Sequence, residues 1–249
     1  MARWKAAGLH FLICVLVASI VVLVMLAVWY PGRLFEAMGG DRLVMILIGV
    51  DVLIGPLITL IIFSPTKPRH LLRFDLTVIG CLQLAALAFG VYVVFEARPV
   101  YMVFAADRFE VTTASEIQPK ERAKVTRAEF ASEPLGGPAI IAVEMPRDPD
   151  EQFRITISGI GGADLKTFPQ YYVPYAEKAA IAASKARPVA LLRANHPESK
   201  KEIADAVQAT GRKEDDLGYL PLRARKKDMA VLVDAKDGSV LGFVPVDPW

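Results

Sequence analysis

The sequence contains few cysteines and few histidines, and this scarcity excludes several kinds of chemistry. Its two cysteines, Cys14 and Cys81, both lie inside apolar runs, so the polar remainder of the chain has none. A disulfide framework or a cysteine-rich zinc site is therefore excluded there, and a packed core has to stabilise that part. The three histidines suggest no common site, because His10 lies in the first apolar run, His70 in the loop of residues 64–75 and His196 in the polar part.

Catalytic motifs are missing as well. The sequence has no HExxH or GxSxG motif and no run of residues with metal-ligand spacing. The glycines in residues 159–162 lack the spacing of a nucleotide-binding loop and instead favour a surface loop. We therefore expect no enzyme activity, no cofactor and no bound metal.

Charge of one sign is not in excess either. The formal net charge is +2, and the part beyond Glu96 carries 22 basic and 22 acidic residues. A nucleic-acid partner usually requires a basic surface, so none is expected here.

What the sequence does have is three long apolar runs, at residues 9–29, 43–63 and 76–95. Each is long enough to cross a bilayer core of about 30 Å as a helix. We expect a transmembrane region over residues 1–96 and an α+β extracytoplasmic domain over residues 97–249. A cleaved signal peptide is the alternative for the first run, but that run is too long and ends in bulky residues, which favours an uncleaved anchor.

Basic residues flank these runs unevenly. Arg3 and Lys5 precede the first run, and the second loop, residues 64–75, carries three basic residues and one acid. The first loop, residues 31–42, balances two basic residues with two acids. The positive-inside rule therefore predicts a cytoplasmic N-terminus and places everything after Arg98 outside the cytoplasm.

A single carboxylate, Asp51, interrupts the second run near its middle, and Gly55 and Pro56 follow it. A charge at that depth costs at least ~2.5 kcal/mol, so Asp51 should face a protein partner or a water-filled cleft, or be protonated. Pro56 removes one backbone hydrogen bond, which predicts a kink near Gly55 that opens space for another helix. The alternative is that Asp51 pairs with a hydroxyl or backbone group of a neighbouring span.

In the polar part, alternation and turn residues predict a hairpin at its start and three strands at its end. The expected strands are 99–106, 108–114, 139–144, 153–157, 188–194, 219–225, 229–234 and 239–244, and the expected helices are 115–130, 176–186 and 197–210.

Three features of this part are candidate contact sites. Arg98 is placed to contact lipid headgroups or a partner protein. The simpler interpretation is that its aliphatic stem lies along apolar surface while its guanidinium group reaches water. Tyr171 and Tyr172, in an aromatic segment, could bind a partner or could cover the domain's own core, which is the favoured reading. The basic run in residues 223–227 indicates a solvated turn, and only weakly a site for an acidic partner.

Three segments resemble the type IV pilin accessory protein family of the TfpX/TfpZ type. They are GVDVLIGPLITLIIF, RFDLTVIGCLQLAALAFGVYVVFEARPVY and VFAADRFEVTTASEI. The resemblance implies a bacterial inner-membrane protein with a periplasmic domain that assists assembly of a cognate pilin, and it supplies no catalytic site.

The hypothesis is therefore a chaperone-like adaptor in the lipid bilayer. Its spans, opened near Gly55 and Pro56, would receive the membrane helix of a pilin, and its periplasmic domain would contact the pilin head. Asp75, at the cytoplasmic end of the third run, could bind the pilin's amino group or could cap its own helix. One alternative is a membrane sensor with a ligand-binding periplasmic domain, but such a protein usually has a larger cytoplasmic module. Another is an envelope enzyme, which the missing catalytic motifs disfavour.

Overall fold

The computed structural model of this chain describes residues 2–64, 66–162 and 164–249, and the chain divides into two units. The first unit comprises Met1–Tyr30 and Gly40–Ala97, and the second comprises Pro31–Gly39 and Arg98–Trp249. The loop between the first two spans therefore folds with the second unit. Pro65, in the expected loop 64–75, lies outside the described residues.

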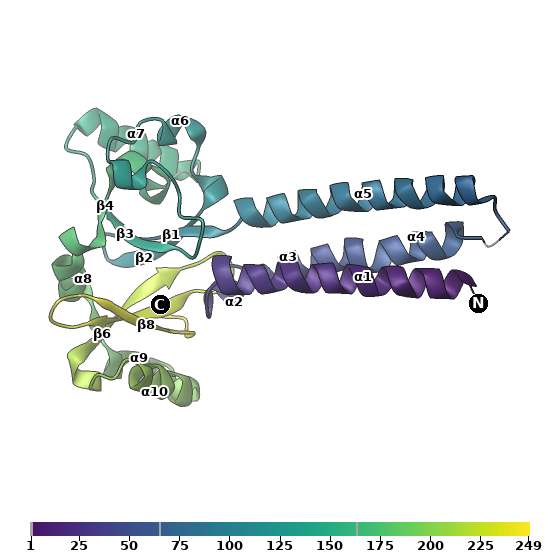
Figure 1. Cartoon of the computed structure of the whole chain (residues 1–249). Coiled ribbons are helices and arrows are strands. Elements are labelled where there is room, and N and C mark those ends of the chain that lie inside the picture. Colours follow the sequence, from purple (N-terminus) through teal and green to yellow (C-terminus); the bar gives the residue numbers. More distant parts are fainter. Residues whose placement is uncertain (1, 65, 163) are drawn as a thin grey trace. The chain divides into compact units, whose positions relative to one another are not determined.

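The first unit consists of three long apolar helical stretches (Figure 1). The first is α1 (Ala2–Val24), continued by the π-helix η1 (Met25–Trp29). The second is α3 (Gly40–Leu47), the π-helix η2 (Ile48–Ile54) and α4 (Gly55–Ile62), and the third is α5 (Arg69–Glu96). All three are long and apolar enough to cross a membrane, which confirms the predicted membrane-protein class.

The second unit is built on one mixed sheet of eight strands. The strands are β1 (Pro99–Ala105), β2 (Arg108–Thr113), β3 (Ala139–Val143), β4 (Tyr172–Pro174), β5 (Arg187–Pro188), β6 (Leu217–Arg223), β7 (Met229–Asp234) and β8 (Val240–Val244). Their order is β4-β3-β1-β2-β6-β7-β8, and β5 pairs with β6. Two pairs, β1 with β3 and β2 with β6, are parallel, and the other pairs are antiparallel.

Turn residues fix the two predicted hairpins. Ala106 and Asp107 join β1 to β2, and Ala106 takes the positive φ of 58° that such a tight turn needs. Gly238, at φ 76°, joins β7 to β8, and a Cβ atom there would lie 1.9 Å from the backbone oxygen of Ala179. Only glycine fits at that turn without displacing the backbone of the neighbouring segment.

Short helices lie near both halves of this sheet (Figure 1). They are α2 (Leu34–Ala37), α6 (Pro119–Arg122), α7 (Pro149–Ile160), α8 (Ala179–Lys185), α9 (Val189–Asn195) and α10 (Lys200–Ala209), with short 3-10 turns between them. One core cluster lies around β1, β3 and β4 and includes Val103 and Tyr172. A second lies around β6, β7, α9 and α10 and includes Leu192 and Ile203. This architecture confirms the predicted α+β class.

The predicted helix over residues 115–130 is wrong. The segment contains only α6 and the 3-10 turns η3 (Ala114–Glu116) and η4 (Ala128–Phe130). A capping box, in which Thr113 and Glu116 bond each other's backbone or side chain, fixes the first turn directly after β2. Pro119 then starts a separate turn, because it has no N–H group to continue the previous one.

The predicted strands at residues 153–157 and 188–194 are also wrong, because residues 153–157 lie in α7 and residues 189–194 lie in α9, with only Pro188 in the short strand β5. In α7, the side chain of Asp148 accepts hydrogen bonds from the N–H groups of Asp150 and Glu151, at 2.8 and 3.3 Å. Asp followed by Pro is a strong start for a helix, and this local signal outweighs the β-branched residues that follow.

Candidate functional site

Polar side chains from all three spans meet inside the first unit. On one side of the cluster, Nδ1 of His10 in α1 and Oγ1 of Thr59 in α4 are hydrogen-bonded at 2.7 Å. On the other, Nε2 of Gln83 in α5 donates to Sγ of Cys14 at 3.6 Å and to the backbone oxygen of Asp51 at 3.2 Å. We call these five residues the polar cluster.

Helical spacing brings the cluster together. Asp51, Gly55 and Thr59 are four residues apart and share one face of the second span, as His10 and Cys14 do on the first. Thr59 and Gln83 were not identified from the sequence. Each is a polar residue on the inner face of an apolar helix. This feature can be recognised only when it is known which faces of the three helices meet.

The backbone around Asp51 has a specific reason to need Gln83. In the five-residue register of a π-helix, the carbonyl of residue 51 pairs with the nitrogen of residue 56. Residue 56 is Pro56, which has no hydrogen to donate, and the Gln83 amide donates to the Asp51 oxygen instead. The π-helix η2 lies directly before Gly55, near which a kink is expected from the sequence.

Gly55 makes this contact possible. A Cβ atom at position 55 would lie 1.8 Å from Nε2 of Gln83, far inside contact distance. Any side chain there would push the Gln83 amide away from the Asp51 oxygen, so the absence of a side chain is a requirement of the cluster.

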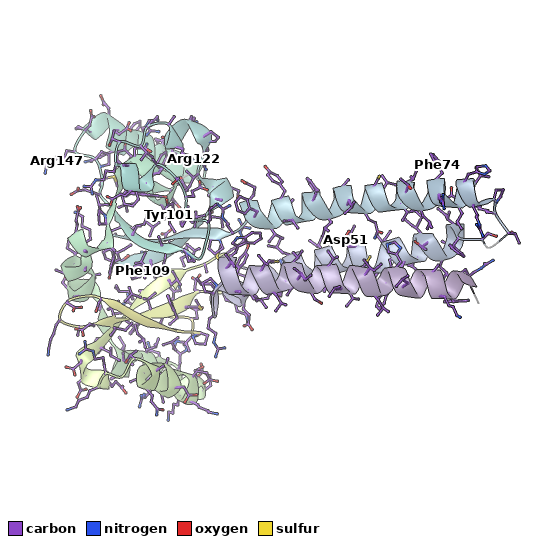
Figure 2. All side chains as sticks on the ribbon, in the orientation of Figure 1. Asp51, Phe74, Tyr101, Phe109, Arg122 and Arg147 are labelled. Carbon is purple, nitrogen blue, oxygen red and sulfur yellow. The ribbon has the colours of Figure 1, made fainter. Side chains whose placement is uncertain are left out.

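The Asp51 side chain is different from the other members of the cluster. It is only 7% exposed, and its Oδ1 is buried without a hydrogen-bond partner in the described part of the chain. The alternative expectation, a bond to a hydroxyl or backbone group of a neighbouring span, is therefore not found among these residues. Figure 2 places Asp51 midway along the three-helix unit, consistent with its central position in the span Gly40–Ile62.

Two grooves meet at Asp51. The first, of about 200 Å³, runs between α1 and α5 and is lined by His10, Cys14, Asp51, Gln83 and apolar residues. The second, of about 260 Å³, runs between the second span and α5 and is lined by Asp51 and by apolar residues such as Phe89. The one buried carboxylate among the residues described in this unit therefore contributes to the walls of two apolar grooves.

The structure corrects the alternative proposed for Asp75. The helix α5 begins at Arg69, so Asp75 lies inside it and does not cap it. Its carboxylate instead forms an ion pair with Nζ of Lys67, at 2.8 Å.

Arg98, at the start of the second unit, is buried and not exposed to headgroups or solvent. Its side chain is 3% exposed and pairs with Glu133 at 3.5 Å, and Glu133 also binds Arg122, labelled in Figure 2. Tyr101 lies near the same Glu133 carboxylate, and burial of its hydroxyl, followed by this negative charge, raises the pKa of Tyr101 to about 12. Arg98 therefore belongs to the interior of its unit, and both expectations for it are corrected.

The two candidate tyrosines have different surroundings. Tyr172 is 1% exposed, belongs to a core cluster and donates its hydroxyl to the backbone oxygen of Lys166. Tyr171 is half-buried and donates to Glu151, which also binds Arg154 at 2.7 Å. The Arg154 bond, then the Tyr171 bond, lowers the pKa of Glu151 to about 2. A surface contact can therefore use Tyr171, whereas Tyr172 serves the core.

Neither unit presents a metal-binding set: no group of three or more His, Cys, Asp or Glu side chains suited to an ion occurs among the described residues.

Comparison with known proteins gives one consistent answer. The family model described as "Fimbrial assembly protein FimB" matches residues 1–39. The chain is 28% identical over 248 residues to the fimbrial assembly protein of serogroup I of Dichelobacter nodosus, covering 98% of this chain and 95% of the relative. It is 27% identical over 247 residues to the serogroup E1 protein of the same organism, with the same coverage.

A third relative, the fimbrial assembly protein of serogroups C1 and C2 of Dichelobacter nodosus, is 34% identical over 113 residues, or 45% of this chain and 86% of the relative. No solved structure matches the chain. The resemblance to pilus accessory proteins is thereby confirmed, and the chain belongs to the fimbrial assembly protein family.

Proposed function

We propose that this protein is a non-enzymatic, chaperone-like adaptor of the bacterial inner membrane that assists assembly of a type IV pilin. The three-helix unit receives the apolar membrane helix of the pilin, and the second unit, in the periplasm, contacts the pilin head. The observation that carries this proposal is the buried Oδ1 of Asp51, which has no hydrogen-bond partner among the described residues and lines two apolar grooves.

A carboxyl group at the middle of a span is costly unless another group binds it. Within the unit, the Gln83 amide is directed to the backbone oxygen of Asp51 and not to its carboxyl group. A polar or cationic group on an incoming helix would supply the missing partner. The apolar walls of the grooves would meanwhile pack against that helix as helices pack in membranes, by close contact of side chains.

The pilin's amino group would meet Asp75 at the cytoplasmic end of α5. This carboxylate already holds a primary ammonium group, that of Lys67, at 2.8 Å. The amino group of a pilin would exchange with Lys67, so the chemistry of the contact is the same in both states.

The pilin head would meet the edge of the sheet at β4. Tyr171 lies beside a hollow of about 250 Å³ that also includes Arg127, Glu144 and Arg147. Tyrosine with nearby charged groups is a common composition for a protein contact surface.

The test is Asp51→Asn, which keeps the size of the side chain and removes its ability to carry charge. We expect piliated cells to become rare at an unchanged level of the variant protein in the membrane, and Asp51→Glu to restore part of the piliation. Normal piliation with Asp51→Asn would remove Asp51 from the mechanism.

A further inference from the structure

The second unit carries an exposed cluster of positive charge at the turn between β6 and β7. Its members are Arg223, Arg225, Lys226 and Lys227, all exposed, and we call it the basic turn. The proposed pilin contacts make no use of it.

Backbone hydrogen bonds fix the basic turn to the loop between the first two spans. The N–H groups of Lys226 and Lys227 both donate to the carbonyl oxygen of Ala37, at 2.8 and 3.2 Å. The aliphatic stem of Lys226 lies over Gly39, where a Cβ atom would be 3.8 Å from Cδ of the lysine. These contacts therefore hold the basic turn next to this loop.

Chain length then limits the distance of the basic turn from the membrane. Ala37 comes three residues before Gly40, where the second span begins. Three extended residues cover at most about 10 Å, and the headgroup region on one side of a bilayer is about 5–8 Å thick. Ala37, to which the basic turn is bonded, is thus held within about 10 Å of the start of the second span, close to the lipid headgroups.

The turn also has the shape and chemistry for a phosphate group. A polar hollow of about 560 Å³ is lined by the four basic residues together with Asp228 and Asp247. Trp249 stacks under the guanidinium groups of Arg108 and Arg223, whose Cζ atoms lie 4.9 and 5.6 Å from the ring centroid. Trp249 in turn donates from Nε1 to Asp228 at 2.7 Å, so the wall of the hollow is held in place.

Two of the four cations have charge available for a ligand. Arg225 forms no ion pair with any other residue that the structure describes, and Lys227 has only a long contact of 3.8 Å with the exposed Glu36. An exposed pair of this length is weak.

We propose that the basic turn binds the phosphate of an anionic phospholipid headgroup, with Arg225 and Lys227 as its main ligands. The short tether to the second span favours a lipid over an acidic protein segment, because the headgroup layer is the nearest source of phosphate. This site would hold the second unit against the membrane surface, and it depends on membrane insertion but not on the identity of the pilin.

The test uses the purified full-length protein in detergent, with lipids exchanged in from mixed micelles and counted by native mass spectrometry. The lipids are phosphatidylglycerol and phosphatidylcholine in equal amounts, and inorganic phosphate is added in a separate arm. The variant is Arg225→Ala/Lys227→Ala. The control is Lys200→Ala/Lys201→Ala, which removes the same charge from exposed positions on α10.

We expect the wild type and the control to retain phosphatidylglycerol over phosphatidylcholine. Each basic residue near an anionic surface contributes about fivefold to binding. The contact with Glu36 reduces the contribution of Lys227. The preference of the variant for phosphatidylglycerol should therefore be about tenfold smaller than that of the wild type. Equal preference in the variant and the control overturns the proposal, as does a wild type without preference. Release of the lipid by millimolar inorganic phosphate assigns the site to free phosphate and also overturns it.

Discussion

The side-chain amide of Gln83 lies 3.2 Å from the backbone oxygen of Asp51, on the neighbouring span. This bond replaces one that Pro56 cannot make, and it passes through the space left empty by Gly55. It joins the third span to the second at the level of the buried carboxylate, which lines both grooves.

Replacing Gly55 with alanine should move the Gln83 amide, because the new Cβ atom would lie 1.8 Å from Nε2. We expect Gly55→Ala to destabilise the protein by about 1 kcal/mol, the typical net contribution of such a hydrogen bond. The same substitution in a Gln83→Ala background should have almost no cost, since the colliding group is gone. Thermal unfolding of the four proteins of this cycle in detergent measures the coupling.

Gly49→Ala is the matched control for this cycle, because a Cβ atom at position 49 meets nothing within 4 Å. It should be neutral or slightly stabilising, as alanine is a better helix former than glycine. Additive effects of Gly55→Ala and Gln83→Ala would contradict the contact.

The ion pair of the buried Arg98 with the partly buried Glu133 predicts an unequal response to removal of either partner. Glu133→Leu removes the carboxylate that binds both Arg98 and Arg122, and we expect a loss of about 3 kcal/mol. Arg98→Met should cost less, about 1–2 kcal/mol, because Glu133 keeps its bond to Arg122.

Chemical unfolding of the full-length protein in detergent gives both values. Arg127→Met serves as the control, because Arg127 makes exposed ion pairs with Glu129 and Glu177, and its removal should cost less than about 1 kcal/mol. A larger loss for Arg98→Met than for Glu133→Leu would be inconsistent with this arrangement.

The low pKa of Glu151, about 2 against an ordinary value of 4.5, predicts a specific acid sensitivity. A carboxylate whose pKa is depressed by folding stabilises the folded state above its unfolded pKa, and this stabilisation is lost as the pH falls through the folded pKa. Between about pH 4.5 and pH 2, the wild type should therefore lose stability that a Glu151→Gln variant has already lost. The melting temperatures of the two proteins, measured in detergent, should converge across this range, and a constant difference would refute the prediction.

Much of the fold was predictable because the sequence carries strong local signals for it. Three long apolar runs define the three long helices, and the hairpin of β7 and β8 follows from alternation on either side of Asp237 and Gly238. The predictions failed where a short signal opposed a longer pattern. Asp148 and Pro149 start a helix through Phe153–Ile157, although the composition of that stretch is typical of a strand.

The site was only half predictable, for a different reason. Asp51, Gly55 and Pro56 are conspicuous as polar or helix-breaking residues inside an apolar run. Gln83 and Thr59 are not, because a single amide or hydroxyl is common in a membrane helix and gains meaning only from what it faces. Arg98 gave a surface-like signal, yet it is buried in the second unit. Tyr172 is buried as well, which agrees with the favoured expectation of a core role.

The central claim, that a pilin helix occupies the grooves beside Asp51, is tested most directly by photo-crosslinking in living cells. Phe89 and Leu82 lie on the same helix, α5, with exposures of 67% and 65%, but Phe89 lines the second groove and Leu82 lines neither groove. A photoreactive residue at position 89 should crosslink to pilin, and one at position 82 should crosslink several-fold less. No pilin adduct at position 89, or equal adducts at both positions, would contradict the account.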